Sequence, residues 1–254
     1  GGNPDLQPET SKTFTLGLVA NPDLVPGLSL TLDYFDIEIE DAIRQTSGSA
    51  KLASCYTTPG FSHPFCASRH HTRNPLTGEV NFLSAQSSNT GDETMRGIDF
   101  GASHTGELGQ LNSHVQLQTT YLIDYETVAF DGADPFEYVG GVGCCEGGYP
   151  EWRGQASWTL SSDCWGVTWN AQYIGEATDL YGDPEGVGYN IDPVVYHNVQ
   201  GRYRLSDTAE LGFGIDNLFD EKAPYVQSWS DGNTDTMTYS LLGRFFYMRA
   251  TLNY

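Results

Sequence analysis

Apolar and polar residues alternate along most of this chain. Near its start, Phe14, Leu16 and Leu18 alternate with polar or small residues, and similar stretches recur as far as the last residue. Successive side chains of a β-strand point to opposite faces, so a period of two indicates strands with one apolar and one polar face. Nine such stretches predict nine strands. They begin near Phe14, Leu28, Ile98, Val115, Trp152, Trp165, Val195, Leu211 and Phe246.

The connections between these stretches are alternately short and long. Residues 21–27, 105–110, 161–164 and 206–210 make short connections, and residues 44 to about 92, 126–150, 175–193 and 217–240 make long ones. A meander with tight turns at one end and long loops at the other is typical of an outer-membrane β-barrel. Several strands of about 9–12 residues also match the length that a tilted strand needs to cross the hydrocarbon. The apolar face would then contact lipid, and the polar face would line the barrel interior.

Aromatic residues support the same interpretation. Several occupy apolar positions that we expect near strand ends, where an interfacial aromatic girdle would lie. These are Trp152, Trp165, Trp169, Tyr173 and Tyr254.

Composition excludes some classes of function. The formal net charge is −21, with 33 acidic against 12 basic residues, which argues against nucleic-acid binding because that requires a basic surface. The chain lacks a run of about 18 apolar residues, so the sequence predicts no transmembrane helix. It also lacks the G-x-S-x-G, H-E-x-x-H and P-loop motifs, and we therefore expect no enzyme activity.

Several stretches together resemble TonB-dependent outer-membrane receptors. They are "GNPDLQPETS" from Gly2, "PGLSLTLDYFDIEIEDAI" from Pro26, "RGIDFGASHTG" from Arg96, "GIDNLFDEKAPYV" from Gly214 and "GRFFYMRATLNY" from Gly243. Their order and spacing agree with that family over essentially the whole chain. The terminal aromatic residue also resembles the last strand of bacterial outer-membrane proteins.

The resemblance implies an all-β fold, an antiparallel transmembrane β-barrel meander. Residues 1–254 would be the C-terminal segment of a larger barrel of the 22-strand type, with the N-terminal plug and the first strands absent. The implied function is TonB-dependent uptake of a scarce nutrient, such as a ferric siderophore, an oligosaccharide or a peptide. The implied partners are the TonB complex through the missing plug, outer-membrane lipid and lipopolysaccharide, and the remaining barrel strands of the same or another chain. A passive porin or structural barrel, and a soluble secreted carbohydrate-binding β-sandwich, are the alternatives.

The five cysteines suggest an oxidising compartment. Cys55 and Cys66 flank a loop that contains proline and glycine, and we expect a disulfide there, with two free thiols as the alternative. A membrane-crossing strand would separate Cys164 from Cys144 and Cys145 by more than a disulfide can span. A vicinal Cys144–Cys145 bond and partners outside this chain both remain open.

Two acidic loops and several loop aromatics are candidate binding residues. Carboxylates in residues 175–193 offer the hard oxygen ligands that Ca²⁺ prefers, although their spacing is not that of an EF-hand. These candidates are Asp179, Asp183, Glu185 and Asp192. The favoured alternative is a solvated loop that free divalent ions bridge to lipopolysaccharide, with no resident cofactor. Aromatic side chains could stack on a sugar or an aromatic siderophore, or simply pack within their own loops. These are Phe136, Tyr138, Tyr181, Tyr189 and Trp229.

Overall fold

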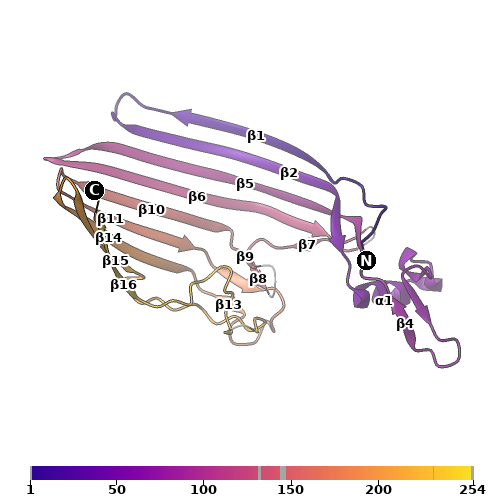
Figure 1. The fold of residues 1–254 in the computed structure, drawn as a ribbon. Helices are drawn as coiled ribbons and strands as arrows, with labels where there is room; N and C mark the ends of the chain where they lie inside the picture. Colours follow the sequence, from indigo (N-terminus) through magenta and orange to yellow (C-terminus); the bar gives the residue numbers. More distant parts are fainter. Residues whose placement is uncertain (1, 131–132, 144–146, 231, 253–254) are drawn as a thin grey trace. The chain divides into compact units, whose positions relative to one another are not determined.

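The computed structural model describes residues 2–130, 133–143, 147–230 and 232–252. Its main feature is one sheet in which nine strands pair in chain order (Figure 1). The strands are β1 (Thr10–Ala20), β2 (Leu28–Gln45), β5 (Ser87–Leu108), β6 (Leu111–Val128), β10 (Trp152–Ser161), β11 (Trp165–Ile174), β14 (Val194–Ser206), β15 (Ala209–Asp216) and β16 (Phe245–Leu252). A tenth, short strand, β7 (Phe136–Glu137), pairs with β6. The predicted meander is confirmed, and β1 and β16 are the two ends of this strand order.

Backbone contacts divide the chain into two compact units. Unit 1 comprises residues 1–13, 37–94 and 126–137, and unit 2 comprises residues 14–36, 95–125 and 138–254. The boundary between the two units falls within the first four strands of the sheet, β1, β2, β5 and β6.

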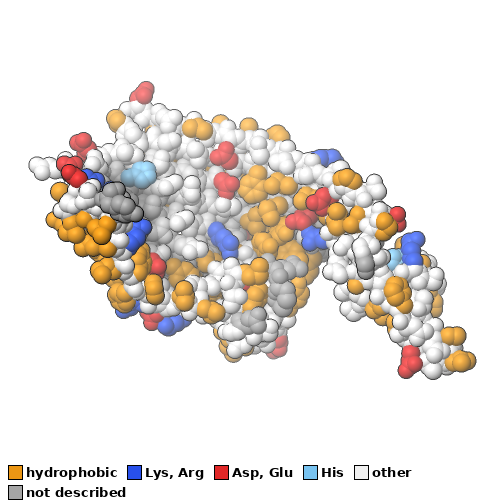
Figure 2. Space-filling view, viewed as in Figure 1, with side chains coloured by type: hydrophobic (Ala, Val, Ile, Leu, Met, Phe, Trp, Pro, Cys, Tyr) orange, Lys and Arg blue, Asp and Glu red, His pale blue; other side chains and the backbone are white. Residues whose placement is uncertain are grey.

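In unit 2 the sheet has one apolar and one polar face, as the alternation predicted. Leu160 lies opposite Val167, and the row continues through Gly201 and Phe213 to Met248. The neighbouring row runs from Ser161 through Gly166, Arg202 and Gly212 to Arg249. The apolar face is uncovered: Phe213 is 54% exposed and Met248 is 80% exposed. In Figure 2 hydrophobic side chains reach the surface over broad areas, whereas carboxylates are scattered.

Three strands are much longer than predicted. β2 and β6 have 18 residues each and β5 has 22, against an expectation of about 9–12. Their ends in unit 1 are residues 37–45 of β2, 87–94 of β5 and 126–128 of β6, and the stretch in β5 is polar on both faces. Side-chain contacts hold these polar ends together, including the ion pairs Lys12–Glu40 and Arg44–Glu93 and the hydrogen bonds that Asn89 Nδ2 donates to the carbonyls of Gln7 and Asp41.

The long connection after β2 forms a small folded segment of unit 1. It contains helix α1 (Gly48–Thr57), the 3₁₀ turns η1 (Pro59–Phe61) and η2 (Pro64–Cys66), and the hairpin of β3 (His71–Arg73) and β4 (Val80–Leu83). Ser47 caps α1, because its side chain accepts a hydrogen bond from the Ala50 N–H. Among the described residues, no helix is long and apolar enough to cross a membrane.

Aromatic residues lie at both ends of the strands in unit 2. Trp152 begins β10, Trp165 begins β11 and Tyr173 lies at the end of β11, each with at least a third of its surface exposed. Trp169 is an exception, because it lies in the middle of β11 and donates through Nε1 to His197 Nδ1 at 3.2 Å. Tyr254 lies outside the described residues.

Candidate functional site

Three of the long connections in unit 2 pack together. We call this assembly the loop cluster: the described residues of 138–149, 175–193 and 217–244. It contains a second sheet, with β13 (Asn190–Ile191), β12 (Ala177–Asp179), β8 (Gly141–Gly143) and β9 (Gly147–Tyr149) in that order. Its apolar side chains join those of neighbouring strand ends in one buried core. The buried core residues are Val142, Ile174, Ala177, Ile191, Val194, Tyr196, Val226, Trp229 and Tyr239.

This core orders segments that are distant in sequence. Val142 and Val226 are completely buried, and Ile174 is 1% exposed. The hydrophobic core of unit 2 therefore lies within the loops, whereas the apolar side chains of the sheet face outward. Burial of a side chain of this size contributes about 1.5–3 kcal/mol, which is enough for a few such residues to fix a loop.

Asp179 connects two parts of the loop cluster. Its carboxylate is fully buried and accepts hydrogen bonds from the Ser228 N–H and hydroxyl, both at 2.6 Å, and from the Tyr181 N–H at 3.1 Å. Its own N–H donates to the Tyr189 carbonyl at 2.8 Å. Hydrogen bonds to an ionised acceptor are about twice as strong as neutral ones, so this carboxylate is a strong tie between residues 175–193 and 217–244.

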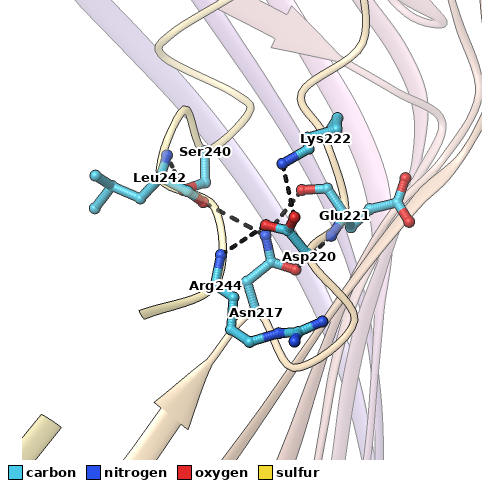
Figure 3. Close-up of polar contacts among 7 residues, drawn as sticks. All are labelled: Asn217, Asp220, Glu221, Lys222, Ser240, Leu242 and Arg244. Carbon is cyan, nitrogen blue, oxygen red and sulfur yellow. Dashed lines mark hydrogen bonds and ion pairs between the residues drawn. The ribbon is translucent and has the colours of Figure 1, made fainter. Parts of the chain in front are cut away.

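The Asn-Leu-Phe-Asp stretch, residues 217–220, fastens the two ends of its own loop (Figure 3). Asn217 Nδ2 donates to the Glu221 carbonyl at 2.8 Å and to the Leu242 carbonyl at 3.4 Å, and Oδ1 accepts from the Glu221 N–H at 2.8 Å. Asn217 and Asp220 have φ of 52° and 59°, a left-handed conformation that Asn and Asp tolerate better than most residues. The motif therefore determines where β15 ends and where the chain returns toward β16.

Asp220 also connects the two ends of this loop (Figure 3). Its carboxylate accepts from Lys222 Nζ at 2.8 Å and from the Arg244 N–H at 2.9 Å. The hydrogen bond from Lys222 and then that from Arg244 lower the pKa of Asp220 below its usual value. A Cβ at Gly243 would lie 2.6 Å from Asp220 Oδ1, so a larger residue there would displace the carboxylate.

A second buried carboxylate, Asp235, is less well satisfied. Its Oδ1 accepts from the Met237 N–H at 2.8 Å, but Oδ2 has no hydrogen-bond partner in the described chain. The hydroxyl groups of Thr234 and Tyr239 are also buried without a hydrogen-bond partner among the residues that the structure describes. Burial, followed by the charge of Asp235, raises the pKa of Tyr239 to about 12, so its hydroxyl stays protonated at physiological pH.

The five candidate aromatic residues differ in how far their side chains are exposed. Tyr138 and Trp229 are each 7% exposed, so both pack within the loops and are not available to stack on a ligand. Tyr189 is half-buried and Tyr181 is 52% exposed, which leaves Tyr181 the most accessible of these in the loop cluster. Phe136 is half-buried in β7, within unit 1. Burial of a loop aromatic depends on distant segments and cannot be recognised from its local sequence.

The four candidate calcium ligands do not form a common site. Asp179 is occupied by Ser228 and Tyr181, whereas Asp183 Oδ1 accepts from the Glu185 N–H at 3.1 Å and Asp192 is exposed. In the described ranges, no group of three or more His, Cys, Asp or Glu side chains is arranged to hold a metal ion. Calcium binding thus stays a prediction without support from the geometry.

The structure describes three of the five cysteines. Cys55 and Cys66 form a disulfide with a Cα–Cα distance of 5.0 Å, and Cys164 is free and exposed. Cys144 and Cys145 lie outside the described residues, so the vicinal bond stays a prediction.

The polar face of the sheet in unit 2 has a cavity of about 620 Å³ that sequence reasoning did not single out. Gln118, Gln155 and Gln172 form a cross-strand row beside it, and Thr120 donates to Asp99 Oδ1 at 2.5 Å. Arg153 and Asp33 also line it. Polar residues at alternate positions in the sequence predict the polar face of the sheet, but they do not predict the cavity on it.

Comparisons with known proteins agree with this architecture. Residues 1–218 match the family described as TonB dependent receptor-like, beta-barrel. The ferric enterobactin receptor PfeA of Pseudomonas aeruginosa, in complex with enterobactin, superposes with a TM-score of 0.63 at 21% identity, covering 99% of this chain and 32% of PfeA. The siderophore receptor PirA of Acinetobacter baumannii gives 0.62 at 18% identity over 99% of this chain and 32% of PirA. The ferric-catecholate import receptor Fiu of E. coli K12 gives 0.52 at 17% identity over 98% and 28%. No curated protein matches the chain.

The chain therefore belongs to the TonB-dependent receptor β-barrel family. It is a family of outer-membrane transporters and receptors of Gram-negative bacteria rather than of enzymes, and the outer membrane is the location of this chain. The chain spans about a third of the length of the structures it matches.

Proposed function

We propose that this chain is part of an outer-membrane receptor that takes up a scarce nutrient, with a ferric siderophore as the substrate class. The observation that carries the proposal is the loop cluster, which has its own hydrophobic core at the long-loop end of a membrane-type sheet. A receptor needs a defined surface that can bind its substrate, and an ordered group of loops supplies such a surface.

The family and the polar face support the transport part of this proposal. Members of the family couple uptake to the TonB complex, so we infer that the complete receptor does the same. An unpaired strand edge in lipid leaves backbone N–H and C=O groups unsatisfied at several kcal/mol each. We therefore propose that β1 and β16 pair with further strands, which would close the polar face into a barrel interior.

The substrate class rests on the nature of the relatives and of the exposed loop residues. PfeA and PirA are a ferric enterobactin receptor and a siderophore receptor. Tyr181 offers an exposed aromatic face within the loop cluster, which can stack on a catechol ring. An oligosaccharide would use the same stacking, and it is the second substrate class to be tested.

The test is uptake by iron-limited cells of the source bacterium that lack the gene for this receptor and carry it on a plasmid. Radiolabelled ferric enterobactin and labelled maltohexaose serve as probes. We expect the gene to restore uptake of the iron complex, and we expect a protonophore to abolish that uptake. Restored uptake that resists the protonophore would indicate a passive porin. Restored uptake of the sugar alone would overturn the siderophore assignment.

A pair of variants locates the binding surface. Tyr181→Ala should reduce uptake about tenfold at low substrate concentration, because one lost stacking contact is worth roughly 1–1.5 kcal/mol. Val187→Ala is the matched control, since Val187 is an apolar residue of the same loop and is 84% exposed. Equal uptake by both variants, at equal surface expression, would exclude this part of the loop cluster from substrate binding.

A further inference from the structure

Two arginines, Arg202 and Arg249, lie on the polar face of unit 2, near the short-turn end of the sheet. Arg202 of β14 is opposite Gly212 of β15, which is opposite Arg249 of β16. Neighbouring strands are about 4.8 Å apart, so the two arginine backbones are about 10 Å apart, with no side chain between them. Both side chains are exposed, and neither guanidinium group forms an ion pair or hydrogen bond with another described residue.

Glycines shape the space around this pair. On its other side Arg202 faces Gly166, and a Cβ at Gly166 would lie 3.0 Å from Arg202 Nε. The ring of Tyr247 covers Gly214, because a Cβ there would lie 2.2 Å from Tyr247 Cζ. The result is a cavity of about 400 Å³. Its walls include Thr159, Thr168, Gln200, Arg202, Tyr247 and Arg249.

The surrounding charge makes this pair unusual. Acidic residues outnumber basic ones by 33 to 12 in the chain, so two arginines without a carboxylate partner do not reflect a shortage of carboxylates. Two acidic residues, Asp163 and Glu210, line a small cavity together with Arg202 and Arg204 near the turn. Among the described residues neither carboxylate forms an ion pair with Arg202 or Arg249. Two like charges that face one cavity repel each other unless an anion lies between them.

We propose that the cavity between Arg202 and Arg249 binds an oxyanion, a carboxylate or a phosphate. The guanidinium group presents its donors in a planar fork that matches the oxygens of these anions, and such charge-assisted pairs are the strong hydrogen bonds of proteins. Gln200 and Thr168 place further hydrogen-bonding groups on the same wall. The anion has two sources: an acidic side chain of a polypeptide that packs on the polar face, or a free solute. This site is separate from the loop cluster and does not depend on which nutrient the receptor carries.

Labelling with phenylglyoxal, a reagent for free guanidinium groups, tests this in outer membranes that contain the whole receptor. Peptide mass spectrometry gives the labelling rates of Arg202 and Arg249 relative to Arg153, which lies on the same polar face. Slow labelling in chloride buffer alone, by about tenfold, would indicate a built-in acidic side chain. Slow labelling only in an excess of citrate or inorganic phosphate would indicate a free oxyanion. Labelling at the rate of Arg153 under both conditions would overturn the proposal.

Two variants separate anion binding from simple steric cover. Arg249→Gln removes half of the pair and should raise the labelling rate of Arg202 severalfold, because the shared anion is then held more weakly. Arg204→Gln is the matched control, since Arg204 lies on the same strand and face but does not line the cavity. Protection of Arg202 that is unchanged in Arg249→Gln would show that Arg202 is merely covered, and this would also overturn the proposal.

Discussion

The two regions of long connections reach a defined structure by different means. Residues 46–86 in unit 1, which we call the disulfide loop, bury only a few side chains, among them Cys55, Phe65 and Lys51. Within this segment the Cys55–Cys66 bond links α1 covalently to η2. The loop cluster in unit 2 has no described disulfide, and its apolar side chains instead join those of neighbouring strand ends in one core of nine buried residues.

Lys51 illustrates how little apolar material the disulfide loop contains. It is 3% exposed, and its Nζ donates to the Ser84 carbonyl at 3.0 Å and lies 5.7 Å from the centre of the Phe65 ring. Burial lowers the pKa of Lys51, because the charged form loses hydration. A segment that buries a lysine beside its only buried aromatic side chain gains little from the hydrophobic effect. A covalent link then supplies the order that a core supplies elsewhere.

The largest effect should come from breaking the core of the loop cluster. Replacing the buried Trp229 by alanine is expected to cost about 4 kcal/mol, because the indole loses its contacts and leaves a cavity. Hydrogen exchange of backbone amides in the loop cluster should become about a thousandfold faster, whereas exchange in the disulfide loop should not change. Leu241→Ala, at a residue 60% exposed in the same loop, is the control. Equal acceleration in both regions would show that they are not ordered independently.

Removing the disulfide should have a comparable but smaller effect, confined to the other region. The double variant Cys55→Ser, Cys66→Ser is expected to destabilise the disulfide loop by about 3 kcal/mol, the entropy of closing a short chain segment. Tryptic cleavage at Lys51, Arg69 and Arg73 should become roughly a hundredfold faster. Cys164→Ser, which removes an exposed free thiol, should leave cleavage unchanged. Cleavage that is no faster in the double variant would contradict covalent ordering.

How much of this the sequence could predict differs between the sheet and the loops. The alternation in "GRFFYMRATLNY" or "WRGQASWTL" reports directly on a two-faced strand, because the period is local. The polar stretch "SSNTGDET", residues 87–94, has no such period, yet it lies in β5 because neighbouring strands pair with it. The extended strands of unit 1 were therefore missed.

The candidate site was harder to predict, because its residues come from distant segments. Asp179 was singled out as a metal ligand, but its partner Ser228 is 49 residues away, and nothing near Asp179 in the sequence indicates that contact. For the same reason, the sequence left open whether Trp229 and Tyr138 stack on a ligand or pack within their own loops, and the structure shows that they pack. The Cys55–Cys66 pair is different, because its separation of 11 residues is short enough to be recognised in the sequence.

A substitution at Asp179 should have an intermediate effect on the stability of the loop cluster. It tests the buried carboxylate separately from the apolar core. Asp179→Asn keeps the shape of the side chain but removes the charge, and its amide group can no longer accept all the hydrogen bonds from Ser228 and Tyr181. The loss should be about 2 kcal/mol, less than for Trp229→Ala. Hydrogen exchange at residues 175–193 and 226–230 would measure it, with Asp183→Asn as an exposed control from the same loop. A loss as large as that of Trp229→Ala would mean that the carboxylate, rather than the core, dominates.

A much smaller effect is expected for Tyr239→Phe. The hydroxyl is buried without a partner in the described chain, so its removal relieves the cost of burying it rather than breaking a hydrogen bond. The stability of the loop cluster should change by less than about 1 kcal/mol, in the favourable direction. Hydrogen exchange that is markedly faster in Tyr239→Phe would show that the hydroxyl has an essential partner, and Tyr239→Leu would show the cost of losing the ring itself.

The smallest effect should be the pH dependence that Asp220 gives to the end of the loop. Because Lys222 and the Arg244 N–H lower the pKa of Asp220 in the folded loop, the folded state favours the ionised carboxylate. Its contribution is therefore complete above the usual aspartate pKa of about 4, and it is lost as the pH falls through the lower pKa of the folded state. The difference in hydrogen exchange at Arg244 between the wild-type chain and Asp220→Asn should be present at neutral pH and disappear in that acidic range. A difference that persists unchanged below that range would mean that the contact depends on the shape of the side chain and not on its charge. The hydrogen bonds at the end of the loop would then act like the apolar core, whose side chains include no carboxylate, rather than as an electrostatic contact.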